Sequence, residues 1–305
     1  MTLHPALIAL LNRQKAAGLP AFRNLSPQEA RAQFALPRAF FGKGPEVLRV
    51  EDRIITRDGL SIPSRFYIPA APKGLLVYFH GGGWVLGELD DFDSLMRELV
   101  HRSGCAILAA DYRLAPEDRF PAALEDARAV IQWAAHVGIA ELGLPKGIAV
   151  GGDSAGGNLA TVCAAELSES SQIRLQLLFY PCVDSNFERD SYREYGNGYL
   201  LSGADMRWFF EQYAPSDKWS DPRISILRSQ DLSRAAPAWI AVARHDVLAD
   251  EIREYAQRLV AAGVPIKLRD YPDLMHGFAR LYGVVDSANV ALSEAAAAVG
   301  AAFDE

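Results

Sequence analysis

A serine stands in a short glycine-rich turn near the middle of the chain. Gly152-Asp153-Ser154-Ala155-Gly156 matches the pattern G-x-S-x-G, follows the apolar run 147–151 and precedes the helix-like run 158–162. Strand, tight turn and helix in this order are typical of a nucleophile elbow, which lifts a serine hydroxyl above a sheet. The flanking residues must be small because the serine backbone is strained there. Taken alone, the pattern also fits a glycine-rich turn with an N-capping serine, so Ser154 is a candidate nucleophile that needs partners.

A second glycine-rich loop could supply the other half of acyl-transfer chemistry. His80-Gly81-Gly82-Gly83-Trp84 follows the strand-like run 75–79. Acyl transfer passes through a tetrahedral intermediate whose negative oxygen is stabilised by backbone N–H donors, each worth about 3 kcal/mol. The sequence therefore predicts an oxyanion hole made by the N–H groups of Gly82, Gly83 and Ala155. No lysine follows as in a phosphate-binding loop, and the dinucleotide pattern G-x-G-x-x-G is absent here.

The remaining residues of this loop have less direct roles. Gly81 is expected to serve the loop's conformation, and His80 is expected to hold the loop by hydrogen bonding rather than to act as a base. Trp84 and Phe209, the latter from an aromatic helix later in the chain, are candidates for the substrate pocket.

Of the six histidines, His276 is the best candidate for a general base. It lies in the loop that follows the last strand-like run, 266–271. Open α/β sheets place their chemistry at the carboxyl ends of their strands. His245 is less suitable because it directly precedes the candidate carboxylate Asp246, and neighbouring side chains on an extended chain point apart.

A carboxylate that orients the histidine is expected between Ser154 and His276 in the chain. Asp246 comes just after the strand-like run 238–243 and is the first choice. Asp250 is the alternative, although it is better explained as the N-cap of the next helix. Asp184, after another strand, is the third candidate.

Strand-like and helix-like segments alternate along most of the chain. Continuous apolar runs predict strands that are covered on both faces, and an antiparallel pair that turns at Asp58-Gly59 precedes them. The fold class is therefore α/β, with an eight-stranded, mostly parallel sheet flanked by helices. The expected strands are 47–56, 60–69, 75–80, 105–111, 147–152, 175–181, 238–243 and 266–271. The expected helices between and after the later strands are 121–135, 158–167, 250–261 and 284–302.

Two segments fall outside this alternation. Residues 1–45 contain a capping box at Ser26-Pro27-Gln28-Glu29, and residues 185–222 contain an N-cap signal at Ser202 before an aromatic helix. An aromatic helix inserted between strands needs a surface to cover. We expect both segments to form one helical cap over a catalytic domain of residues 46–184 and 223–305. The alternative is a surface excursion with a small core of its own.

The composition excludes several other classes of protein. A net charge of −7 over 305 residues argues against a nucleic-acid surface, which needs clustered positive charge. Cys105, Cys163 and Cys182 are odd in number and widely spaced, so buried thiols in a reducing, cytoplasmic setting are expected rather than disulfides or a zinc site. The N-terminal stretch 1–18 reads as an amphipathic helix, not as a signal peptide or membrane span, so no membrane insertion is expected.

With these motifs in place, the sequence resembles the hormone-sensitive-lipase-like family (bacterial family IV) of the α/β-hydrolase superfamily. The matching pieces, in the family's order, are HGGGW at 80–84, DYRLAPE at 111–117, FPAALED at 120–126, GDSAGG at 152–157, DVLAD at 246–250 and HGF at 276–278. The resemblance implies a carboxylesterase acting on small-molecule esters of short to medium acyl chains, with Ser154, His276 and Asp246 as a catalytic triad. It also implies a cap, no cofactor or metal, and a homodimer. Tyr112 and Arg113 would belong to the scaffold.

Two other functions fit the same motifs. An amidase or peptidase would use the same triad, and only a comparison of substrates separates it from an esterase. The second is a non-catalytic small-ligand receptor, like the plant gibberellin receptors that resemble this family, and loss of the catalytic histidine would favour it. His276 stands in its expected motif.

Overall fold

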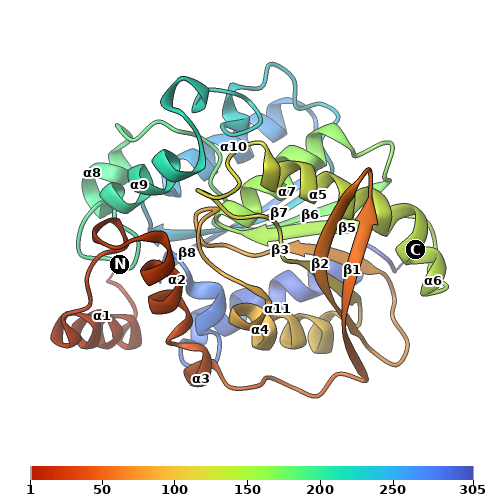
Figure 1. Ribbon diagram of the computed structural model, residues 1–305, viewed down its shortest axis with the longest axis horizontal. Coiled ribbons are helices and arrows are strands. Elements are labelled where there is room, and N and C mark those ends of the chain that lie inside the picture. Colours follow the sequence, from red (N-terminus) through yellow and green to blue (C-terminus); the bar gives the residue numbers. More distant parts are fainter. Residues whose placement is uncertain (1, 305) are drawn as a thin grey trace.

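The centre of the molecule is one eight-stranded sheet, seen in a computed structural model that describes residues 2–304 (Figure 1). The strand order is β1-β2-β4-β3-β5-β6-β7-β8, and β2 runs antiparallel to both of its neighbours while the remaining pairs are parallel. The predicted fold class is confirmed. The strands are β1 (Arg49–Arg57), β2 (Leu60–Ile68), β3 (Leu75–Phe79), β4 (Ala106–Ala110), β5 (Ile148–Asp153), β6 (Ile173–Phe179), β7 (Ala238–His245) and β8 (Ile266–Met275).

Strand positions agree with the apolar pattern, and the differences lie at strand ends. Strands β3 and β4 are buried along their whole length, as expected for strands covered on both faces. The turn between β1 and β2 is at Asp58 and Gly59, which both have positive φ angles, as a tight hairpin turn requires. Strand β8 continues four residues beyond the predicted end because its pairing with β7 resumes at Met275 after an irregularity.

Helices cover both faces of the sheet. Figure 1 shows α4 and α11 on one face and α5, α7 and α10 on the other. The helices on the first face are α4 (Leu89–Ser103) and α11 (Asp286–Ala301), and those on the second are α5 (Ala122–Trp133), α7 (Ala155–Glu166) and α10 (Ala249–Ala261). Helix α5 runs on through a π-helical turn (Ala134–Gly138) into the short α6 (Ile139–Glu141), so the predicted helix 121–135 ends too early.

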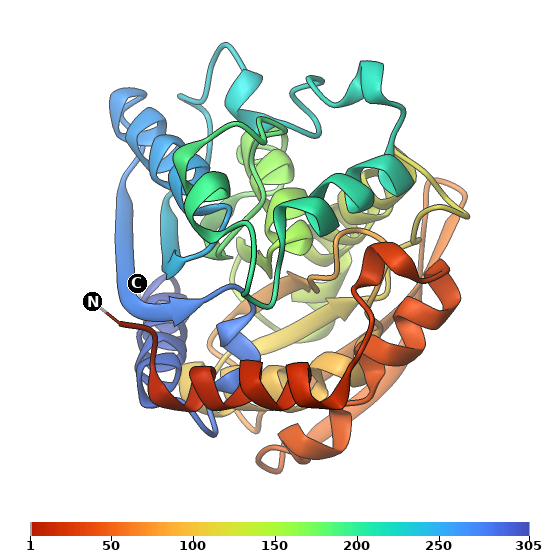
Figure 2. The same cartoon turned by 90° about the vertical axis from the view of Figure 1, so that its left-hand side faces the viewer.

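The two segments outside the alternation meet at one end of the sheet. The first holds α1 (Pro5–Ala17), a 3₁₀ turn (Phe22–Asn24), α2 (Pro27–Ala35) and α3 (Arg38–Phe41), and the second holds α8 (Asp190–Tyr195) and α9 (Gly203–Tyr213). Figure 2 looks onto this end, with the N-terminal helices in red and orange and α8 and α9 in green above them.

Specific contacts join these segments to each other. The Arg23 guanidinium lies 3.1 Å from the Asp205 carboxylate, and the rings of Phe22 and Phe209 are 6.2 Å apart. The capping box at Ser26 and Glu29 and the N-cap at Ser202 are formed as predicted. Aromatic side chains of both segments are therefore held next to the carboxyl ends of the central strands.

Other predictions concern thiols, membranes and metals. Cys105, Cys163 and Cys182 are buried and unpaired, as expected. No helix within residues 2–304 has the length and apolar character to cross a membrane. The same residues contain no cluster of three or more histidine, cysteine or acidic side chains that could hold a metal ion.

Candidate functional site

Ser154 occupies a strained turn between β5 and α7. Its φ of 53° lies in the left-handed region, which a serine rarely adopts. The two flanking glycines are needed for space, because a Cβ on Gly152 would lie 2.4 Å from the carbonyl carbon of Gly156, and one on Gly156 would lie 2.0 Å from the carbonyl oxygen of Phe79. The turn therefore presents the serine hydroxyl at the carboxyl edge of the sheet and at the start of a helix.

The structure brings Ser154, His276 and Asp246 into one hydrogen-bonded row. His276 Nε2 lies 3.0 Å from Ser154 Oγ, and His276 Nδ1 lies 2.7 Å from Asp246 Oδ2. The second carboxylate oxygen, Oδ1, accepts a hydrogen bond from the backbone N–H of Leu248 at 3.0 Å. The Asp246 side chain is fully buried, whereas His276 keeps 12% of its side chain exposed. This geometry allows proton transfer between hydroxyl and imidazole, with the carboxylate fixing the ring orientation.

The two alternative carboxylates lie elsewhere. Asp184 is held by Arg189 at 2.6 Å and by Arg228 at 3.1 Å. The prediction that Asp250 caps α10 is wrong, since the N-cap is Leu248 and no side chain caps it. The Asp250 carboxylate instead accepts a hydrogen bond from the backbone N–H of Ser191 at 2.8 Å, a contact made only once residues 185–222 are folded.

Three backbone N–H groups, two in the loop after β3 and one at the start of α7, have no hydrogen-bond partner in the described part of the chain. Within residues 2–304, no hydrogen bond uses the N–H of Gly82, Gly83 or Ala155. Gly82 has a φ of 125°, where only glycine is comfortable, and its carbonyl accepts the N–H groups of Val85 and Leu86. These three donors are the ones that the sequence predicted for an oxyanion hole.

A buried network fixes the start of this loop. The Gly81 N–H and the Tyr78 hydroxyl both donate to Asp153 Oδ1, at 2.9 and 3.0 Å. Nδ1 of His80 lies 2.8 Å from the carbonyl oxygen of Gly81, and the His80 ring stacks on Tyr112 at 4.5 Å. Burial lowers the pKa of His80, which favours its neutral form. His80 therefore holds the loop, as predicted, and lies outside the hydrogen-bonded row.

The motif 111–117 also supplies scaffold. The Tyr112 hydroxyl donates to the carbonyl oxygen of His80 at 2.7 Å. The Arg113 guanidinium binds the buried carboxylate of Asp126 at 2.9 Å, which ties the motif to α5.

Asp153 gives a pH-dependent prediction for stability. Burial raises the pKa of its carboxyl to about 6, against 3.8 for a free aspartate. A group with a raised folded-state pKa stabilises the fold below the unfolded pKa, and this contribution disappears as the pH rises through about 6. At ~1.4 kcal/mol per pKa unit, Asp153→Asn should gain about 2–3 kcal/mol in unfolding free energy relative to the wild type between pH 4 and pH 7. Denaturant titrations of both proteins at each pH would measure this, and parallel curves would contradict it.

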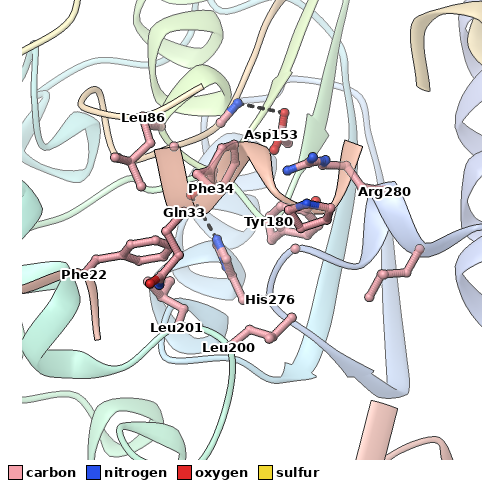
Figure 3. A pocket seen from close by; sticks show the side chains of 18 of the residues that line it. Phe22, Gln33, Phe34, Leu86, Asp153, Tyr180, Leu200, Leu201, His276 and Arg280 are labelled. Atoms are coloured by element: carbon pink, nitrogen blue, oxygen red, sulfur yellow. Dashed lines mark hydrogen bonds between the residues drawn. The ribbon is translucent and has the colours of Figure 1, made fainter. Parts of the chain in front are cut away.

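A cavity of about 380 Å³ opens beside Ser154 and His276. Most of its lining is apolar, and half of the lining residues come from the two segments that meet at this end of the sheet (Figure 3). The main side chains that they contribute are Leu10, Phe22, Phe34, Leu201, Met206 and Phe209.

The two residues predicted for the substrate pocket differ in placement. Phe209 lines the cavity and packs on the oxyanion loop, where a Cβ on Gly83 would lie 2.2 Å from its ring. Trp84 belongs to the lining loop, but its side chain is fully buried and stacks on Tyr213 at 4.3 Å. The Trp84 indole therefore supports the loop from behind and leaves no exposed surface for a ligand.

Sequence reasoning missed two side chains at this site. Tyr180 follows β6, and its ring lies 4.7 Å from the His276 ring while its hydroxyl accepts the N–H of Ala279 at 3.2 Å. Arg280 follows His276 by four residues and lines the cavity. The one signal for Arg280 was a charged residue within the otherwise apolar run 278–281.

Known proteins share this sequence pattern. A model of the alpha/beta hydrolase fold family matches residues 76–280. The chain is 38% identical to an ethyl acetate hydrolase from Pseudomonas putida, an alignment that covers 96% of each chain. It is 36% identical to the carboxylesterase NlhH of Mycobacterium tuberculosis over 83% of this chain and 82% of that protein.

The three-dimensional structure agrees with these relatives. A hyperthermophilic esterase from the archaeon Pyrobaculum calidifontis superimposes with a TM-score of 0.93 and 36% identity, covering 99% of both chains. The match therefore includes the two segments at the end of the sheet as well as the sheet itself. The chain belongs to the alpha/beta hydrolase family, in the group of esterases that resembles hormone-sensitive lipase.

Proposed function

We propose that the protein is a serine carboxylesterase that hydrolyses small carboxylic esters through a covalent acyl-enzyme. The observation that carries this proposal is the row Asp246–His276–Ser154 at the edge of a cavity whose lining also includes Gly82, Gly83 and Ala155. The relatives are named as ester hydrolases, which favours an ester over an amide as the substrate.

The first half of the reaction acylates the serine. His276 Nε2 takes the Ser154 hydroxyl proton as Oγ bonds to the ester carbonyl carbon. The N–H groups of Gly82, Gly83 and Ala155 stabilise the resulting oxyanion, and Asp246 stabilises the imidazolium. The intermediate collapses when the carbon–oxygen bond to the alcohol breaks and the leaving oxygen takes the proton from Nε2.

The second half releases the acid. A water molecule gives a proton to Nε2 of His276 as its oxygen bonds to the acyl carbon. The second tetrahedral intermediate uses the same N–H donors. It collapses when the bond to Ser154 Oγ breaks and Oγ regains its proton, so the carboxylic acid leaves and the free enzyme is restored.

A paired-substrate assay tests the reaction class. p-Nitrophenyl butyrate and the p-nitroanilide of butyric acid present the same acyl group to the cavity, one as an ester and one as an amide. We expect rapid turnover of the ester and turnover of the anilide slower by several orders of magnitude. Equal rates would favour the amidase, and no turnover of either, together with no labelling by a fluorophosphonate, would favour the receptor.

The oxyanion loop gives a prediction of its own. Gly82→Ala places a Cβ 2.1 Å from the carbonyl oxygen of Leu86 and forces a side chain into a φ of 125°. Because the loop must shift, its N–H donors lose their alignment, and kcat should fall by about 10²–10³-fold, the cost of one lost donor. Gly198→Ala, at a positive φ but with open space around it, is the matched control and should leave kcat unchanged. An unaltered kcat in Gly82→Ala would argue against this oxyanion hole.

We propose further that residues 1–45 and 185–222 form one cap that sets acyl-chain length. Phe22 and Phe209 face each other across the two segments, and both line the cavity. Phe22→Ala enlarges the cavity, so the ratio of kcat/KM for p-nitrophenyl decanoate to that for the butyrate should rise several-fold. Ile8→Ala, on an exposed position of α1 outside the lining, should leave the ratio unchanged. A ratio insensitive to Phe22→Ala would contradict the cap.

Short- to medium-chain esters are the proposed substrates, because a cavity of about 380 Å³ has room for a small acyl group and its alcohol.

Burial raises the pKa of Cys105 to about 11 and raises that of Cys163 and Cys182 above their usual range, so all three stay as inert thiols. Unpaired thiols support a reducing, cytoplasmic location. A homodimer stays a prediction, which sedimentation analysis would test.

A further inference from the structure

Arg280 sits in an aromatic cage at the edge of the cavity. Its guanidinium carbon lies 4.8 Å from the ring centre of Phe34, 4.5 Å from that of Phe41 and 4.8 Å from that of Phe92. These rings come from α2, α3 and α4, whereas Arg280 comes from the 3₁₀ turn (Phe278–Leu281) that follows His276. Figure 3 shows the guanidinium pointing toward Asp153, next to Tyr180 and Phe34.

The guanidinium has no hydrogen-bond partner among residues 2–304. Nε and Nη2 of Arg280 are closed to solvent and unpaired, and no carboxylate lies within 4.0 Å of any of its nitrogens. Aromatic faces attract the positive charge but accept none of its N–H groups in a normal hydrogen bond. Burial lowers the pKa of Arg280, which reflects the same loss of water.

The neutral polar side chains of Gln14, Gln33 and Tyr180 share the cavity with Arg280. Outside the hydrogen-bonded row, the charged lining side chains are Arg280, Asp153 and Arg13, and Arg13 is exposed. Asp153 Oδ1 already accepts hydrogen bonds from the Gly81 N–H and the Tyr78 hydroxyl. When a substrate displaces water from this cavity, the donors of Arg280 therefore need an acceptor that the substrate itself must bring, because a hydrocarbon chain leaves them unpaired.

We propose that Arg280 selects esters that carry a second acceptor oxygen, a ketone or carboxylate oxygen on the arm of the substrate lying against Phe34 and Phe92. The inference rests on the proposed esterase function and adds a substrate class to it. A site built to bond a polar group discriminates strongly against the analogue that lacks it, since its own buried donors are then stranded. Arg280 is thus a specificity residue, and the three phenylalanines hold it in place.

The competing explanation is purely structural. Arg280 would then only hold α2 and α3 against α4 through its contacts with the three rings. Loss of that support would slow the hydrolysis of every ester alike. The two explanations therefore differ in the ratio between substrates and not in the overall rate.

The test compares three ethyl esters of equal acyl length: ethyl hexanoate, ethyl 5-oxohexanoate and monoethyl adipate. Each kcat/KM is divided by the rate constant for alkaline hydrolysis, which removes intrinsic reactivity. In the wild type at least one oxygen-bearing ester should exceed ethyl hexanoate by tenfold or more. Arg280→Met should lower that preference about 10–100-fold, mainly through KM, with ethyl hexanoate changed less than about threefold. Arg207→Met, which removes a similar arginine–phenylalanine contact on Phe187 outside the cavity lining, should leave the ratio unchanged.

The outcomes separate the possible substrates. If only the keto ester has a higher corrected kcat/KM than ethyl hexanoate, the site binds a neutral acceptor and Asp153 repels the carboxylate. If the adipate ester has the higher value, the site binds an anion. Arg280→Lys, which keeps the charge, should retain part of the adipate preference and provides a second variant if Arg280→Met does not fold. A wild-type ratio near one, or a ratio that Arg280→Met leaves unchanged, overturns the inference. Failure to hydrolyse any of the three esters would instead contradict the proposed esterase function.

Discussion

Ser154→Ala is expected to lower kcat/KM for p-nitrophenyl butyrate by at least about 10⁴-fold, because within residues 2–304 Ser154 Oγ is the one hydrogen-bond partner of His276 Nε2 and is the atom that forms the acyl-enzyme. Residual hydrolysis above the rate in water would come from the oxyanion donors and from binding alone. The fold should be unaffected, since alanine fits the same turn and the serine hydroxyl makes one hydrogen bond within residues 2–304, with the histidine ring. Stopped-flow or plate assays with purified protein would measure the loss.

Covalent labelling provides the control for this prediction. A fluorophosphonate should modify the wild type once, on the peptide that contains Ser154, and mass spectrometry reads the added mass. Ser170→Ala changes a serine on an exposed turn and should be labelled and active like the wild type. Retained turnover or retained labelling in Ser154→Ala would mean that another residue is the nucleophile.

Asp246→Asn is expected to reduce kcat by about 10⁴-fold while the protein stays folded. The carboxylate accepts from His276 Nδ1 at 2.7 Å and from the N–H of Leu248 at 3.0 Å. An amide can keep the contact with Leu248 through its oxygen, which turns its NH₂ group toward Nδ1. The histidine then places its proton on Nε2 and cannot accept the serine proton. Nor does a negative charge remain to stabilise the imidazolium.

Asp250→Asn is the matched control because it makes the same chemical change four residues away. Its carboxylate binds the N–H of Ser191, so the variant should lose some stability and keep kcat within about threefold. Circular dichroism and thermal unfolding would verify that both variants are folded. A larger loss of kcat in Asp250→Asn than in Asp246→Asn would exchange the roles of the two aspartates.

Local sequence was sufficient for the parts of the site that depend on backbone geometry. The turn at Ser154 requires glycine on both sides for steric reasons, so the five residues 152–156 are enough to predict it. The glycines at 82 and 83 have positive φ angles for a similar reason. Alternation of buried runs with helices predicted a parallel sheet, and parallel strands bring the ends of β5, β7 and β8 to one edge. The meeting of Ser154, Asp246 and His276 follows from that topology.

Long-range packing determined the contacts of Asp250 and Trp84, which the neighbouring residues in the sequence do not predict. Asp250 has the residue type of an N-cap but binds Ser191, fifty-nine positions away in sequence, because α8 packs against α10. Trp84 reads as a pocket residue, yet its ring stacks on Tyr213 at the end of α9.

The sequence by itself determined the α/β sheet, the strained serine turn and the glycine loop, because these depend on φ angles or on the burial of contiguous residues. It also determined the order of the three reactive side chains along the chain. Only the tertiary structure decided the shape of the cavity and the unpaired guanidinium of Arg280 within it. The cage around Arg280 joins Phe34, Phe41 and Phe92 to a turn some 190 to 250 residues later. Side chains so far apart in the chain are brought into contact by the packing of whole elements. The spacing of residues within one segment therefore does not predict that contact.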